Sequence, residues 1–165
     1  MDAERWAVAR KLIATELERA PKDHWLMARL AVTFYEQRNY DRALYWDSMA
    51  LQEAPYCPLA IWGYASDLEM LGRYDEALAA FRWIANWKED YLAYGECGEG
   101  IRRARSLVTD CFYRIACIWE SKRQWKSSAA AFQTYLSRRT VGSGSIYRLR
   151  DAKARCNRVL SRVRG

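Results

Sequence analysis

A five-residue pattern recurs along this chain at a spacing of 34 residues. Residues 40–44 read Tyr-Asp-Arg-Ala-Leu, and residues 74–78 read Tyr-Asp-Glu-Ala-Leu. Pro21 and Pro55 are separated by the same interval. A unit of this length cannot bury its own apolar face, whereas stacked pairs of helices can. The repeat therefore predicts a short all-α solenoid of stacked helix pairs.

The period is interrupted once. Residues 125–129, Trp-Lys-Ser-Ser-Ala, begin 51 residues after Tyr74, which is one period plus 17 residues. A glycine-rich stretch at 95–100 breaks the helical pattern, and a helix is expected from Ile101 to about Ser121. We expect the extra residues to lengthen the neighbouring helices and to form an insertion loop at 89–100. Insertions in repeat proteins often lie on a binding face.

The remaining pattern predicts one domain over residues 1–165. A capping helix is expected at 4–20, with an apolar side that includes Trp6 and Leu17. Asn39 and Gly72 are expected at left-handed positions in the tight turns. The first repeat (24–55) is expected to contain helices 24–37 and 40–53. The second repeat (58–88) is expected to contain helices 58–71 and 74–88. A third repeat (101–138) and a basic capping helix (145–163) follow.

The repeated positions resemble the tetratricopeptide repeat (TPR) family over roughly residues 22–140. Asp47 departs from the family pattern, which has an aromatic residue at that place. The resemblance implies a right-handed α-solenoid of about three helix pairs, and a non-enzymatic scaffold or adaptor that binds a protein or peptide. The matching residues of the second repeat are Ile61, Tyr64, Ala65, Leu68, Gly72, Tyr74, Ala77 and Phe81, and those of the first are Leu30, Ala31, Phe34, Tyr40, Ala43, Ala50 and Pro55.

In this family one face of each first helix lines a concave groove. Only Arg114 matches the lysine and asparagine positions with which some members grip a chaperone's terminal carboxylate, so that partner is not expected. The groove is expected to be open. The alternative is that the N-terminal helix or the 89–100 loop folds over it. Repeat phase assigns the partner-binding groove to Trp25, Arg29, Tyr35, Trp62, Ser66, Glu69, Tyr113, Arg114 and Glu120.

Basic charge is concentrated at the C-terminus. Residues 138–165 hold nine Lys or Arg and one Asp, a net charge of +8, whereas residues 1–137 carry −1. Such a block suits nucleic acid or an anionic surface. A capping helix that shows its arginines to water is the other interpretation, and homodimer assembly through its apolar seam is a third. The residues of this alternative basic face are Arg148, Arg155, Arg158 and Arg162.

The sequence offers little for catalysis. His24 is the single histidine, no His/Cys/Asp cluster has zinc spacing, and the 95–100 loop lacks the ending of a phosphate-binding loop. We therefore expect no enzyme activity, cofactor or metal site. Five cysteines without CxxC spacing suggest reduced thiols and a cytoplasmic location. No apolar run approaches the roughly 18–20 residues of a membrane span, and residues 1–5 do not resemble a signal peptide.

Overall fold

The computed structural model describes residues 3–164, and side chains from Arg5 onward. Met1, Asp2 and Gly165 lie outside the described residues. The expectation that residues 1–5 do not form a signal peptide falls partly on these residues. Every regular element between 3 and 164 is helical, which confirms the predicted all-α class. The chain divides into two compact units, Met1–Ala80 and Phe81–Gly165. The expected single domain over 1–165 stays a prediction.

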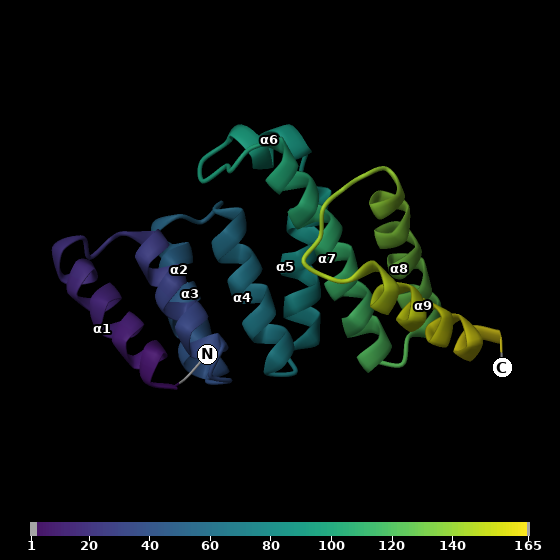
Figure 1. Ribbon diagram of the computed structural model, residues 1–165, viewed down its shortest axis with the longest axis horizontal. Helices are drawn as coiled ribbons and strands as arrows, with labels where there is room; N and C mark the ends of the chain where they lie inside the picture. The colour runs from purple at the N-terminus through teal and green to yellow at the C-terminus, as the bar shows by residue number, and fades with distance from the viewer. Residues whose placement is uncertain (1–2, 165) are drawn as a thin grey trace. The chain divides into compact units, whose positions relative to one another are not determined.

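The first unit packs consecutive helices side by side. It contains α1 (Ala3–Arg19), α2 (His24–Tyr35), α3 (Tyr40–Glu53) and α4 (Pro58–Met70). Each helix contacts the next, and α2 also contacts α4 (Figure 1). Alanines fill much of the interface: Ala31, Ala43 and Ala60 are fully buried. Such small side chains let helix backbones approach closely, and larger residues such as Leu30 and Leu68 fill the remaining core.

Helix α5 (Tyr74–Asn86) begins in the first unit and ends in the second. Its buried residues are Ala77, Leu78, Phe81 and Ile84. Their spacing places them on one side of the helix, as expected for an amphipathic segment.

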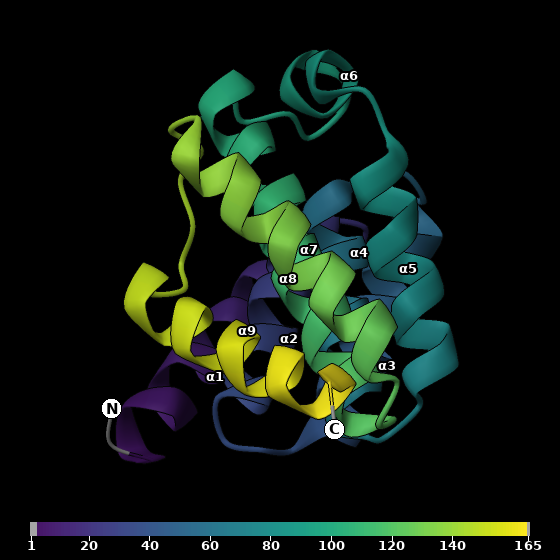
Figure 2. The same ribbon diagram turned by 90° about the vertical axis from the view of Figure 1, so that its right-hand side faces the viewer.

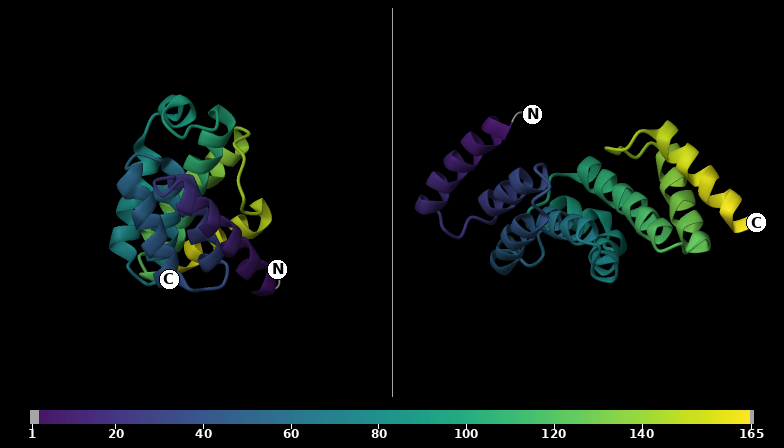
Figure 3. Two further views of the ribbon diagram at one scale, coloured as in Figure 1. Left: turned by 90° about the vertical axis from the view of Figure 1, so that its left-hand side faces the viewer. Right: turned by 90° about the horizontal axis from the view of Figure 1, so that it is seen from below.

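The second unit contains the long helix of the expected third repeat. Its helices are α6 (Glu89–Tyr94), α7 (Ile101–Ser121), α8 (Trp125–Thr140) and α9 (Leu149–Arg164). Helix α6 packs on α7, α7 on α8, and α8 on α9 (Figures 2 and 3). Phe132 and Tyr135 of α8 are fully buried, together with Ile118 of α7 and Val159 of α9. These residues form the core of this unit.

Each helix pair turns through one residue with left-handed backbone. These residues are Arg38 (φ 60°), Gly72 (φ 76°) and Arg123 (φ 56°). They are 34 and 51 residues apart, the intervals of the sequence repeat. In each turn the next amide donates to a carbonyl five residues earlier, as in a Schellman motif. The expected left-handed role of Asn39 is therefore wrong: its side chain instead caps α3 by accepting from the Arg42 amide at 3.4 Å.

The predicted insertion loop is shorter than expected, because residues 89–94 form helix α6. Glu89 and Asp90 lie in its first turn, where negative charge is favourable. Leu92 and Ala93 are buried, which gives this short helix an apolar anchor. Only the glycine-rich residues 95–100 are irregular.

The C-terminal helix begins at Leu149 and not at 145, because hydrogen bonds hold the preceding residues in a non-helical conformation. The Tyr135 hydroxyl lies 3.0 Å from the Ser145 hydroxyl and donates to the Tyr147 carbonyl at 3.2 Å. The Ile146 amide donates to the Asp110 carboxylate at 3.2 Å. None of the described helices is both long enough and apolar enough to cross a membrane.

Candidate partner-binding surfaces

Helix α2 carries the expected groove residues Trp25, Arg29 and Tyr35. Trp25, Arg29 and Val32 follow a spacing of four and three residues, so they lie on one face. Asp23 positions the start of this face, because its carboxylate accepts from the Trp25 amide at 2.9 Å. Arg29 is exposed, Val32 is 52% exposed and Trp25 is half-buried. Tyr35 is half-buried at the end of α2.

Helix α4 carries the corresponding residues of the second repeat. Trp62 and Glu69 are half-buried, and Met70 is 45% exposed. Ser66 is buried, and its hydroxyl donates to the Trp62 carbonyl at 2.8 Å. Its polar group is therefore satisfied within the helix. Because α2 and α4 pack together, we call the partly exposed residues of both helices the α2/α4 surface: Trp25, Arg29, Val32, Tyr35, Trp62, Glu69 and Met70.

Two buried carboxyl groups, one from α3 and one from α4, interact with each other in the first unit. Asp47 of α3 is 3% exposed and Asp67 of α4 is 1% exposed. Burial raises the pKa of Asp47 well above its usual value, and the charge of Asp67 and a hydrogen bond with it raise this pKa further. Gly63 faces the same group, since a Cβ atom at this position would overlap the Asp47 carboxylate. The glycine thus allows α4 to pack against the acid.

In the second unit, the expected groove face is covered by residues 145–164, which we call the C-terminal segment. The rings of Tyr113 and Tyr147 are stacked, with centroids 3.9 Å apart and planes inclined by 16°. Arg114 is half-buried and hydrogen-bonded to the Tyr147 hydroxyl. Burial raises the pKa values of Tyr113 and Tyr147 above their usual value, although Arg155 and Arg114 respectively oppose the shift.

Helix α9 completes this cover. Arg155 forms an ion pair with Glu120, and its guanidinium lies 6.0 Å from the ring centroids of Tyr113 and Phe132. Tyr113, Arg114 and Glu120 therefore all contact the C-terminal segment. The sequence suggests the N-terminal helix or the 89–100 loop as the segment that could cover the groove. Within residues 81–164, the face of α7 is covered by the C-terminal segment instead.

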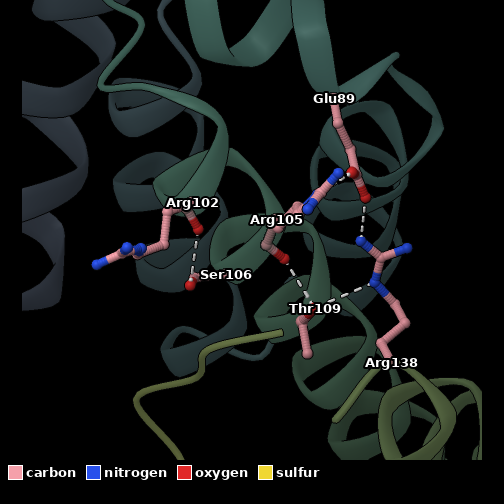
Figure 4. A network of polar contacts seen from close by, with 6 residues as sticks. All are labelled: Glu89, Arg102, Arg105, Ser106, Thr109 and Arg138. Atoms are coloured by element: carbon pink, nitrogen blue, oxygen red, sulfur yellow. Dashed lines mark hydrogen bonds and ion pairs between the residues drawn. The ribbon is translucent and has the colours of Figure 1, made fainter. Parts of the chain in front are cut away.

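A separate polar network joins α6, α7 and α8 (Figure 4). Glu89 pairs with Arg105 at 3.0 Å and with Arg138, whose Nε also donates to the Thr109 hydroxyl at 3.1 Å. Although burial alone would raise the pKa of Glu89, the hydrogen bonds from Arg138 and Arg105 lower it below its usual value. Arg103, close by, pairs with Glu99 at 3.1 Å. The network thus tethers the three helices through one carboxylate that two arginines share.

The expected basic face is divided by the packing of α9. Arg148, Arg158 and Arg162 are exposed, whereas Arg155 is half-buried against Glu120. Two hollows lie where α9 meets the start of α8. One, of about 410 Å³, is lined by Arg123, Trp125 and Arg162. The other, of about 200 Å³, is lined by Glu120, Trp125, Arg158, Val159 and Arg162. We call the two together the α8/α9 pocket.

Sequence reasoning missed the roles of Tyr147 and Trp125 at these surfaces. Trp125 takes the place of Tyr40 and Tyr74 in the repeat, which predicts a helix start. The position of Trp125 beside the arginines of α9 depends on how that helix packs, and the spacing of residues in the sequence does not indicate this packing.

No protein-family model matches the chain, and no curated protein matches it.

Proposed function

We propose that this chain is a TPR-type scaffold that binds a protein or peptide segment on the α2/α4 surface. The observation that carries the proposal is a contrast between helix faces that correspond by repeat phase. The face of α7 is covered by the C-terminal segment, whereas α2 and α4 leave Val32 and Met70 about half exposed. A right-handed solenoid arrangement belongs to the same proposal, which the recurrence of left-handed turns at 38, 72 and 123 supports.

The partner we propose is a segment with apolar or aromatic side chains and few charges. Val32 and Met70 offer exposed apolar area on the two helices that carry the half-buried rings of Trp25 and Trp62. Aromatic residues contribute strongly to interfaces because they bury a large area with little loss of conformational freedom. Arg29 adds an exposed donor at one side of this apolar area.

The C-terminal segment illustrates the type of contact that such a face accepts. It places Tyr147 flat on Tyr113 and pairs Arg155 with Glu120.

We propose no chemical reaction for the α2/α4 surface, so the protein acts by holding its partner. A cytoplasmic setting is part of the proposal and is supported by four buried free thiols, those of Cys57, Cys111, Cys117 and Cys156.

Site-specific photo-crosslinking tests this function. A photoreactive amino acid replaces Val32 in one variant and Tyr45 in a control; Tyr45 is 58% exposed on α3. We expect the Val32 probe to form one dominant adduct in cytosolic extract, absent from the control. A synthetic peptide of the crosslinked segment should then bind the wild-type chain and lose affinity on Trp25→Ala. Equal labelling from both positions would count against the α2/α4 surface.

Charge favours nucleic-acid binding as a second candidate function. Residues 81–165 contain 18 Lys or Arg and 7 Asp or Glu, a net charge of +11, whereas residues 1–80 carry −4. Phosphate contacts from such a basic region produce binding that weakens steeply with salt. This function would use the second unit and is independent of the α2/α4 surface.

A further inference from the structure

We infer that the α8/α9 pocket binds one nucleotide of a single-stranded nucleic acid, with the base on Trp125 and the phosphates on the surrounding arginines. This inference rests on the second candidate function, since it names the site and the ligand class for nucleic-acid binding by the second unit. It assigns this role to Arg123, Trp125, Arg158 and Arg162.

The pocket combines cations with an aromatic ring that are distant in the sequence. Arg123 and Trp125 come from the α7–α8 turn and the start of α8, whereas Arg158 and Arg162 belong to α9. The basic tail contributes Tyr147 as its own aromatic residue, but that ring is stacked on Tyr113. Trp125 thus supplies the aromatic surface beside the exposed arginines of α9.

The arginines of the pocket are available for an anion. Arg123, Arg158 and Arg162 are exposed, and within residues 5–164 their guanidinium groups take part in no ion pair or hydrogen bond. The pocket's one carboxylate, Glu120, is already paired with Arg155. An entering phosphate would therefore meet unpaired positive charge and would not be repelled by a free acid. Guanidinium groups bind phosphate oxygens through two parallel hydrogen bonds.

The backbone of Arg123 makes its side chain easy to test by substitution. Its φ of 56° lies in the left-handed region, where Gly72 stands in the preceding helix pair. Glycine adopts this conformation without the steric cost that a side chain carries. Arg38 has the same conformation at the corresponding turn of the first unit, so glycine should be tolerated at both turns, and Arg123→Gly removes a guanidinium group from the pocket without straining the backbone.

Nucleic acid fits these features better than an acidic peptide does. Every base has a flat face that stacks on an aromatic ring, so one tryptophan serves any sequence. Positive charge also continues beyond the pocket through two further exposed residues, Arg148 just before α9 and Lys153 within it, which suits a strand with regularly spaced phosphates. A volume of about 410 Å³ lies within the usual range for small-ligand pockets.

Fluorescence anisotropy with a labelled oligouridylate of roughly 12 nucleotides tests the inference. We expect the full chain to bind, and Trp125→Ala to weaken binding about tenfold. Arg123→Gly should weaken it several-fold and reduce the slope of log affinity against log salt by about 0.7 for each phosphate that is no longer neutralised. Because glycine suits this turn, loss of binding in Arg123→Gly cannot be attributed to misfolding.

Two matched variants serve as controls. Arg38→Gly makes the same change at the corresponding turn of the first unit, and Arg150→Gln removes an α9 charge that does not line the pocket. Both should retain nearly wild-type affinity. If Arg123→Gly and Trp125→Ala also bind as the wild type does, the pocket assignment is wrong while nucleic-acid binding stands. If the wild-type chain does not bind the oligonucleotide, or if polyglutamate displaces it equally well, the nucleic-acid function itself fails.

Discussion

Tyr147 lies flat against Tyr113, with ring centroids 3.9 Å apart, and so holds the C-terminal segment on helix α7. The contact is reinforced on both sides. The Tyr135 hydroxyl donates to the Tyr147 carbonyl at 3.2 Å, and Arg155 of α9 pairs with Glu120. The covered face of α7 is therefore a packed part of the second unit, and its residues are not available to a partner while the segment is in place.

Replacing Tyr147 by alanine should release this segment. Removing a stacked aromatic pair and much of its buried area should cost about 2 kcal/mol or more of the free energy of unfolding. Urea denaturation measures that decrease, and limited trypsin digestion should cut α9 faster. Tyr147→Phe is the control, because it keeps the ring stack and removes only the hydroxyl contact with Arg114. Equal protection of the alanine variant and the wild type would show that the stack does not hold the segment.

Adding a methyl group at Gly63 should destabilise the first unit. The new Cβ atom would overlap the Asp47 carboxylate, so α3 and α4 would have to move apart. We expect Gly63→Ala to cost about 1–3 kcal/mol, the usual range for overpacking. Adding Asp47→Ala should recover most of this stability, because it removes the atoms that collide. Additive effects in this double-mutant cycle would contradict the proposed contact.

Asp47 should make the stability of the first unit depend on pH. Its pKa in the folded chain is raised above 3.8 by burial and by Asp67, so the folded state binds the proton more tightly than the unfolded state. Stability is then greatest below about pH 3.8 and falls as pH rises towards the folded-state pKa. Asp47→Asn removes this decrease, and should therefore be more stable than the wild type at neutral pH.

Urea titrations across a pH series check this expectation. The advantage of Asp47→Asn should disappear at acid pH, where the wild-type carboxyl group is protonated as well. Asp41→Asn is a suitable control, because this carboxylate is exposed in the first turn of the same helix. A constant difference between Asp47→Asn and the wild type over the whole pH range would argue against a protonated Asp47.

The left-handed turns should respond to substitution with opposite signs. Arg38→Gly relieves an unfavourable conformation at φ 60° and should raise the free energy of unfolding by up to about 1 kcal/mol. Gly72→Ala introduces the same strain at φ 76° and should lower it by about 1 kcal/mol, since no neighbour lies within contact distance of the added methyl. Effects of the same sign at both positions would mean that the turns are not equivalent.

The repeat in the sequence is sufficient to predict the principal helices. Helix α3 has the expected bounds, and α2, α4 and α7 agree to within about two residues, because apolar spacing and helix punctuation are local signals. The sequence points to Asn39 for the left-handed turn that Arg38 makes, since asparagine tolerates left-handed backbone and also caps helices. The presence of an asparagine alone does not show whether it adopts left-handed backbone or caps the following helix.

The surfaces are harder to predict than the helices. Helix α6 has only six residues, too few for a periodic signal, and it depends on burial of Leu92 and Ala93. The stacking of Tyr147 on Tyr113 and the approach of α9 to Trp125 join residues more than 30 positions apart. Such contacts follow from tertiary packing, to which a single sequence gives no direct access.

Binding of a partner segment to the α2/α4 surface is tested most directly by an affinity measurement with one exposed substitution. Val32 is 52% exposed, so Val32→Glu should leave the helical circular dichroism spectrum unchanged while placing a charge in the proposed interface. Calorimetry with the crosslinked partner segment should show at least tenfold weaker binding for Val32→Glu, and unchanged binding for Tyr45→Glu on α3. Equal affinity of Val32→Glu and the wild-type chain would contradict the account.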